Sequence, residues 1–187
     1  MIAVIDNYDS FTYNLVHYIE EYEEVVDVYR NDQVSIDQLS KYDHILISPG
    51  PGLPKEIPFL QQVFDTYSAT KKILGICLGL QAMIEYYKGE LYNLPEVLHG
   101  VQGSCTIIKN DPLFKGIESP FLIGHYHSWG VKSNAIPDDV LVLAKDQENR
   151  VMNVKHKYHD FYGIQFHPES VLCPKGKKII RNWLKET

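Results

Sequence analysis

The chain has 187 residues, of which 44% are hydrophobic and 22% are charged, and its formal net charge is −6. This composition is typical of one globular domain with a substantial core. The acidic balance, without a long basic run, argues against nucleic-acid binding. No apolar run approaches the roughly 18 residues of a membrane-spanning helix, and the first residues lack the pattern of a signal peptide. We therefore expect one cytoplasmic domain over residues 1–187 that binds neither nucleic acid nor membranes.

The three cysteines lie far apart, at positions 77, 105 and 173. Their number and spacing match neither a disulfide framework nor the paired Cys-x-x-Cys pattern of a zinc site. This usage is typical of a reducing compartment, which agrees with the cytoplasm. We expect Cys105 and Cys173 to have structural or incidental roles.

The first half of the chain alternates between strand-like and helix-like segments. Apolar runs predict strands at residues 2–5, 25–29, 44–48 and directly before Cys77. Helical patterns occur at about 11–22, 58–67 and 80–87, with a short helix or turn at 36–40. Asp9 and Ser10 are the predicted N-terminal cap of the first helix.

The second half is richer in strands. They are predicted at about residues 104–109, 121–126, 140–146, 150–157 and 161–166, and a helix at about 175–185 ends the chain. The whole pattern predicts the α/β class, with a single-domain, largely parallel, doubly wound mixed sheet and helices on both faces. Ligands bind beyond the carboxyl ends of such strands, which is where the glycine-proline loop at 49–54 and the turn at Cys77 lie.

Cys77 stands in a sharp strand-to-helix turn, Gly75-Ile76-Cys77-Leu78-Gly79. This is the pattern of a nucleophile elbow, in which small glycines allow a tight backbone and the reactive atom is held at the end of a sheet. The positive end of the following helix favours a thiolate. The alternative is that Cys77 is a small buried hydrophobic residue, as most lone cysteines are.

A cysteine nucleophile needs a base, and His167-Pro168-Glu169 follows a predicted strand. His167 and Glu169 point the same way in an extended segment, so the carboxylate can orient the imidazole. Pro168 favours that extended conformation. The alternative is a solvated loop without a catalytic role.

Four motifs occur in a fixed order: Asp6-Asn7-Tyr8-Asp9-Ser10 with the residues that follow it, Ser48-Pro49-Gly50-Pro51-Gly52, the Cys77 turn, and His167-Pro168-Glu169. Together with Leu98-His99-Gly100 and Tyr126-His127-Ser128, they resemble the class I (triad-type) glutamine amidotransferases over essentially the whole chain. The resemblance is to the glutaminase subunits of chorismate-using synthases, anthranilate synthase component II and the para-aminobenzoate synthase component. It implies a flavodoxin-like fold.

The resemblance implies a mechanism. Cys77 would attack the side-chain amide of glutamine and form a thioester, His167 would transfer the protons, and Glu169 would orient His167. The oxyanion hole would use the N–H of Leu78 and of a glycine in the loop, because Pro51 has none to donate. The implied glutamine-binding and oxyanion-hole positions are Gly50, Pro51, Gly52, Leu78, Gln81, Ser128 and Trp129.

The resemblance also implies that the chain needs no cofactor or metal and that ammonia passes to a separate chorismate-binding synthase subunit, in a heterodimer or heterotetramer. The product would be anthranilate, for tryptophan, or aminodeoxychorismate, for folate, or both. Three residues depart from the family pattern. Leu80 replaces a common histidine, His125 a common arginine and Val101 a common lysine, and we expect positions 125 and 101 to face the partner.

Other interpretations remain open. The loop at residues 50–52 could bind phosphate, although no Gly-Lys-Ser/Thr follows it. His125 and His127 could join His167 and Glu169 in a metal site. The chain could also be a stand-alone cysteine hydrolase of γ-glutamyl compounds, or a scaffold with a vestigial site.

Overall fold

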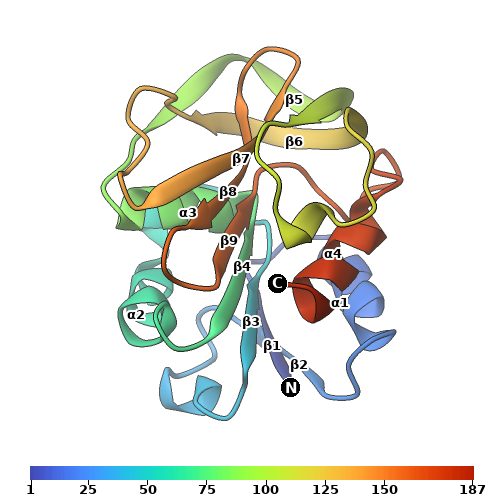
Figure 1. Cartoon of the computed structure of the whole chain (residues 1–187). Coiled ribbons are helices and arrows are strands. Elements are labelled where there is room, and N and C mark those ends of the chain that lie inside the picture. Colours follow the sequence, from blue (N-terminus) through green and yellow to red (C-terminus); the bar gives the residue numbers. More distant parts are fainter.

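The computed structural model describes all 187 residues, and its core is one nine-stranded sheet in the order β2-β1-β3-β4-β9-β8-β7-β5-β6 (Figure 1). Four pairings, from β2 to β9, are parallel, and the other four are antiparallel. The parallel strands are β1 (Ile2–Asp6), β2 (Val26–Arg30), β3 (His44–Ile47), β4 (Lys72–Ile76) and β9 (Phe161–Ile164). The antiparallel strands are β5 (Leu91–Ile107), β6 (Phe121–Val131), β7 (Val140–Asp146) and β8 (Val151–His156).

Helices cover both faces of the parallel part, and a separate apolar core lies under each pair. On one face are α1 (Thr12–Glu20) and α4 (Gly176–Lys185), and on the other are α2 (Pro58–Tyr67) and α3 (Leu78–Tyr86) (Figure 1). Short 3₁₀ helices are η1 (Asp37–Leu39), η2 (Pro54–Glu56) and η3 (Pro112–Phe114). Because both faces of the central strands are covered, these strands read as continuous apolar runs. The predicted mixed, doubly wound α/β fold is confirmed.

The antiparallel strands differ most from the predicted bounds. β5 begins at Leu91, not at residue 104, and β6 continues to Val131, not to residue 126. Most side chains of β5 before Gly103 are at least partly exposed, so that segment lacks the buried alternation by which a half-buried strand is recognised. Its pairing with β6 is also interrupted by register shifts.

The start of α1 also differs from the prediction. The helix begins at Thr12, and its N-cap, Phe11, makes no side-chain capping bond. Asp9 accepts a hydrogen bond from the N–H of Phe11, and Asp6 accepts one from the Thr12 hydroxyl. Two carboxylates therefore stabilise the turn before the helix, and Ser10 does not cap it. The other early shift is small, because α3 begins at Leu78 and not at Leu80.

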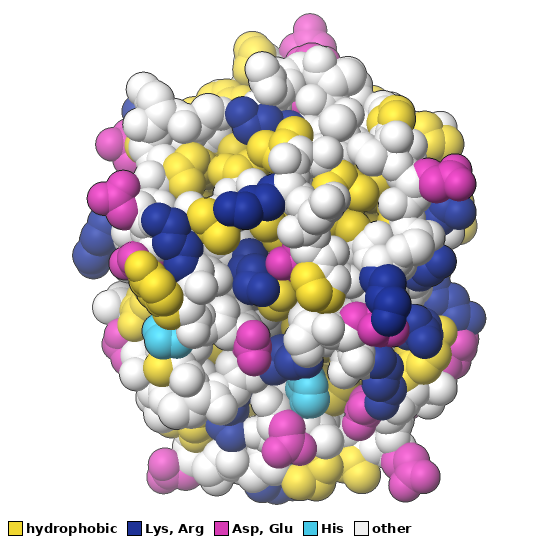
Figure 2. Space-filling view, in the orientation of Figure 1, with side chains coloured by type: hydrophobic (Ala, Val, Ile, Leu, Met, Phe, Trp, Pro, Cys, Tyr) yellow, Lys and Arg dark blue, Asp and Glu magenta, His cyan; other side chains and the backbone are white.

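The surface in Figure 2 carries hydrophobic side chains mainly over its upper part, where the antiparallel strands lie, with Lys and Arg among them. Charges of both signs are scattered below, and this face shows no continuous basic surface. None of the helices has both the length and the apolar character that crossing a membrane requires.

Candidate active site

The nucleophile turn is built by β4, Cys77 and α3. Cys77 has a φ of +52°, a conformation that only a tight turn imposes on a non-glycine residue. The turn brings helix and strand very close, since a Cβ on Gly75 would lie 2.4 Å from the carbonyl carbon of Gly79. The Cys77 N–H donates to the Ile164 carbonyl at 2.6 Å, which ties the turn to β9. The elbow geometry predicted from the sequence is therefore present.

His167 and Glu169 lie beyond β9, the strand beside β4. His167 Nδ1 and Glu169 Oε1 are 2.6 Å apart, and both side chains are almost completely buried. Burial alone would lower the pKa of His167, but its interactions with the nearby Cys77 sulfur and with Glu169 outweigh burial and raise the pKa to about 10. The imidazole is therefore charged at neutral pH.

The glycine-proline loop follows β3, on the other side of β4. Asn7 holds its start: the Asn7 side chain donates to the Ser48 carbonyl and the Asn7 N–H to the Ser48 hydroxyl, both at 2.9 Å. A Cβ on Gly50 would lie 2.4 Å from the Asn7 carbonyl oxygen, so only glycine fits there. Gly52 has a φ of +79°, and Pro51 between them is exposed and lacks an N–H. Three adjacent strands thus bring the loop, Cys77 and His167 to one edge.

The remaining predicted binding residues lie on α3 and β6. Gln81 is buried, and its Nε2 donates to the Trp129 carbonyl at 3.1 Å. Ser128 and Trp129 are half-buried neighbours on β6. Leu78 is buried as the first residue of α3, directly after the nucleophile. Helix α3 and strand β6 are therefore joined beside Cys77.

A cavity of about 180 Å³ lies against His167 and Glu169. Its other lining residues are Phe11, Asn14, Tyr126, Ser170 and Val171. The Tyr126 ring packs on His167, with the ring centroids 4.9 Å apart.

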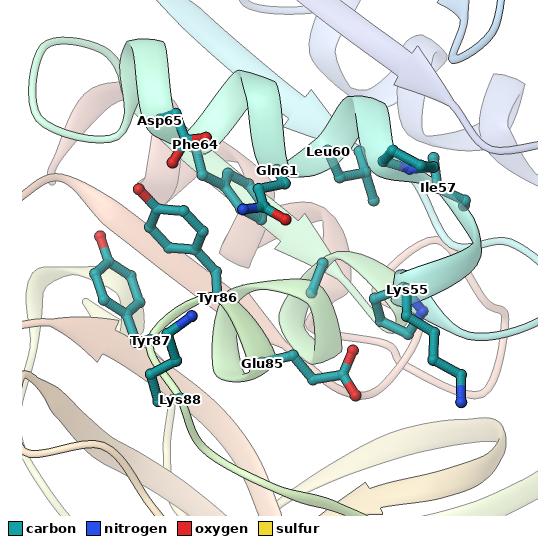
Figure 3. A pocket seen from close by; sticks show the side chains of 13 residues that line it. Lys55, Ile57, Leu60, Gln61, Phe64, Asp65, Glu85, Tyr86, Tyr87 and Lys88 are labelled. Carbon is teal, nitrogen blue, oxygen red and sulfur yellow. The ribbon is translucent and has the colours of Figure 1, made fainter.

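The larger groove of the molecule lies elsewhere, between α2 and α3 (Figure 3). It has a volume of about 690 Å³, and Phe64 and Tyr86 meet in it with ring centroids 5.3 Å apart. Charged side chains such as Lys55 and Glu85 line it as well, but it contains no cysteine or histidine. Cys77, His167 and Glu169 do not line this groove, which is separate from the Cys77 site.

The other two cysteines are buried, as Cys77 is. Cys105 and Cys173 are buried free thiols, and burial raises the pKa of Cys173 to about 12 and also raises that of Cys105. Both thiols are protonated at neutral pH.

The histidines of β6 bind each other instead of converging with the His167–Glu169 pair. His125 Nδ1 lies 3.1 Å from His127 Nε2. No group of three or more His, Cys, Asp or Glu side chains has the geometry to hold a metal ion.

The three residues that depart from the family pattern differ in how far they are buried. His125 is only 1% exposed, so the expectation that it faces a partner is wrong; its place on β6 turns it inward. Val101, its neighbour on β5, is 42% exposed. Leu80 is fully buried in the core between α3 and the sheet, where it needs no hydrogen bond.

Sequence reasoning missed two residues that contact the predicted triad. Gln165 places its side-chain nitrogen 3.6 Å from Cys77 Sγ, and Tyr126 packs on His167. Gln165 stands two residues before His167, and the one available signal was a buried polar residue at the end of an apolar strand. No local pattern links Tyr126 to His167, because they are 41 positions apart and meet through the sheet.

Comparison with known proteins gives one consistent result. The family model described as glutamine amidotransferase class-I matches residues 3–187. Anthranilate synthase component 2 of Cyanidium caldarium is 40% identical over 191 residues, covering 98% of this chain and 97% of that protein. The aminodeoxychorismate/anthranilate synthase component 2 of Bacillus subtilis is 35% identical over 189 residues, covering 99% and 96%. A solved glutamine amidotransferase of Thermotoga maritima has the same fold, with a TM-score of 0.81 at 13% identity over 98% of this chain and 96% of that one.

Proposed function

Because this chain belongs to the class-I glutamine amidotransferase family, we propose that it is the glutamine-hydrolysing subunit of a chorismate-using synthase. The relatives that match along nearly their full length are the second components of anthranilate and aminodeoxychorismate synthases. The observation that carries the proposal is the burial of Cys77, His167 and Glu169 together at the ends of adjacent strands.

The proposed reaction has two steps. Cys77 Sγ attacks the side-chain amide carbon of glutamine, and His167 gives its proton to the departing ammonia, which leaves a γ-glutamyl thioester. Water then attacks the thioester while His167 accepts a proton from it; the carbon–sulfur bond breaks, glutamate is released, and the Cys77 sulfur and the protonated His167 are restored. Glu169 holds the imidazole orientation through its bond to Nδ1. The chain's own groups and water suffice for this chemistry, so we propose that it uses no cofactor.

The proposed oxyanion hole combines the N–H of Leu78 with that of Gly50 or Gly52. The first N–H groups of a helix have no partner within the helix, and Leu78 is the first residue of α3. Pro51 shapes the loop without donating. Stabilising the negative oxygen of the tetrahedral intermediate is worth about 10²–10³ in rate for each donor.

We propose that Gln81, Ser128 and Trp129 hold the rest of the glutamine molecule. The Gln81 Nε2 donates to the Trp129 carbonyl and to the oxygen of Gln165, so the Gln81 Oε1 is the atom left to accept from the substrate's amino group. The Trp129 carbonyl accepts from Gln81 and from His127, so it is the position of this segment, and not this carbonyl, that would serve the substrate.

A partner synthase would bind where the cavity beside His167 opens. Val171 is 92% exposed and Phe11 is 46% exposed, and both line that cavity. Exposed apolar side chains at a cavity mouth favour contact with another protein. Ammonia would pass from this site to the partner along a path shielded from solvent. The identity of the partner would determine whether the product is anthranilate or aminodeoxychorismate. It would also determine whether the complex is a heterodimer or a heterotetramer. The free thiols support action in the cytoplasm.

The test is covalent labelling with a glutamine analogue that has an electrophilic carbon in place of the amide. We expect mass spectrometry of the digested protein to find the label on Cys77, and excess glutamine to protect it. A label only on Cys105 or Cys173 would contradict the assignment.

A further inference from the structure

A buried glutamine outside the predicted site contacts the sulfur of Cys77. Gln165 directly follows β9, is fully buried, and places its Nε2 3.6 Å from Cys77 Sγ. In this contact the amide N–H donates and the sulfur accepts. A hydrogen bond to the charged form of a group favours that form, so this donor stabilises a thiolate over a thiol.

The donating orientation of Gln165 depends on its other partner. An amide side chain can be turned over with little change in shape, so its orientation follows from the hydrogen bonds it makes. Gln165 Oε1 lies 3.3 Å from Gln81 Nε2, and the same Nε2 lies 3.1 Å from the Trp129 carbonyl. A carbonyl only accepts, so Gln81 must present its NH₂ group there. That NH₂ faces the oxygen of Gln165, and the NH₂ of Gln165 is left for the sulfur.

The Trp129 carbonyl is itself held by a second donor. His127 Nδ1 lies 2.8 Å from it, and burial lowers the pKa of His127 to about 4, so at neutral pH the single ring proton is on Nδ1. His127 Nε2 then accepts from His125 Nδ1. His125 Nε2 lies 3.9 Å from Asp146 Oδ2, and the same carboxylate oxygen forms an ion pair with Arg150 Nε at 2.6 Å. Every hydrogen-bond direction from β6 to the sulfur is therefore set.

We propose that Gln165 is a further catalytic residue that donates a hydrogen bond to Cys77 Sγ, and that Gln81 and the Trp129 carbonyl hold it in the donating orientation. This assignment rests on the proposed role of Cys77 as the nucleophile. Since Gln81 also lines the proposed glutamine site, the same side chain binds substrate and orients the group that prepares the sulfur.

The test measures alkylation of Cys77 by iodoacetamide as a function of pH, followed by mass spectrometry of the Cys77 peptide. Gln165→Met keeps a similar volume but has no donor. We expect its Cys77 to react about tenfold more slowly than wild type at pH 7 and to approach the wild-type rate at high pH, because only the thiolate reacts.

Asn153→Leu is the matched control. Asn153 is a fully buried amide on β8 that donates to the Gly163 carbonyl at 2.9 Å, and its side chain forms no hydrogen bond with Cys77, Gln81 or Gln165. We expect the pH profile of this variant to match wild type. Equal profiles for Gln165→Met and wild type would overturn the proposal, as would a rate lowered equally at every pH.

Gln81→Met is the second variant, for use if Gln165→Met does not fold. It keeps Gln165 but removes the donor that orients it, so we expect alkylation at pH 7 to slow two- to threefold, with recovery at high pH. An unchanged profile would overturn the orienting role. Alkylation requires neither glutamine nor a synthase, so this result is independent of whether the proposed function holds.

Discussion

The two halves of the sheet contribute to the site in different ways. In the parallel half, β3, β4 and β9 are buried apolar strands that end at one edge, and the proposed reacting groups follow their last residues. In the antiparallel half, the contributing residues lie within β6, where His127 and the Trp129 carbonyl face α3 and fix Gln81. The parallel half therefore supplies the proposed reacting groups together with Glu169, and the antiparallel half orients Gln81.

This difference predicts unequal effects of substitution. A change to a reacting group removes a chemical step, whereas a change in the orienting half alters geometry and protonation. The effect of a substitution on activity should therefore decrease from the ends of the parallel strands toward the outer surface.

Among substitutions that keep the Cys77 nucleophile, the largest effect is expected for Glu169→Gln. The amide does not reproduce the carboxylate bond to His167 Nδ1, so we expect the rate of glutamine hydrolysis to fall by about 10²–10⁴. In wild type the rate should fall as the pH rises through about 10, where His167 loses the proton that ammonia needs. In Glu169→Gln the rate should begin to fall at a lower pH, because the pKa of His167 is no longer raised by the carboxylate. A variant with the wild-type pH profile would contradict the role of Glu169.

The same pKa links His167 to stability. The pKa is raised from 6.5 to about 10 in the folded protein, so its contribution is complete below pH 6.5 and is lost as the pH rises through about 10. Urea denaturation at several pH values measures this loss, and Glu169→Gln should diminish the dependence over the same range.

Gly50→Ala should have the next largest effect. Its Cβ would collide with the Asn7 carbonyl, so the loop must move and its N–H would leave the proposed oxyanion hole. We expect hydrolysis to slow about 10²-fold, measured by glutamate release.

Gly116→Ala is the control for Gly50→Ala. Gly116 has a φ of +69° far from the site, and its added Cβ meets only the flexible end of Lys178. This substitution should lower the melting temperature and leave the hydrolysis rate unchanged. A rate that falls equally in both variants would show that strain, and not the loop position, explains Gly50→Ala.

The smallest effect is expected at the surface. Val171→Asp places a charge at the mouth of the cavity beside His167, so we expect the Kd for the synthase partner to rise about tenfold. Tyr158→Asp is the control, because Tyr158 is 77% exposed and precedes β9, at the end of the strand opposite to His167. Equal partner affinity of both variants, measured by titration of the purified synthase, would place the interface elsewhere.

The sequence predicted the strands of the parallel half and the residues that the structure brings together at their ends, for a physical reason. Strands covered on both faces are short apolar runs, and the polar residue after each run is conspicuous, as with Cys77 and His167. The orienting groups were harder to find. His125 was expected at a partner surface because a sequence does not show which face of a bulged strand is turned inward. Gln165 and Cys77 are 88 positions apart in the sequence and meet because β9 pairs with β4. No local sequence pattern shows such a contact.

The central claim is that Cys77 releases ammonia from glutamine for a partner enzyme. Its most direct test compares the assembled wild-type and Cys77→Ser complexes with two nitrogen sources, glutamine and ammonium salt. We expect the variant to lose glutamine-dependent product formation by at least about 10³-fold and to keep the ammonia-dependent reaction at the wild-type rate. Glutamine-dependent synthesis at the wild-type rate in Cys77→Ser would contradict it.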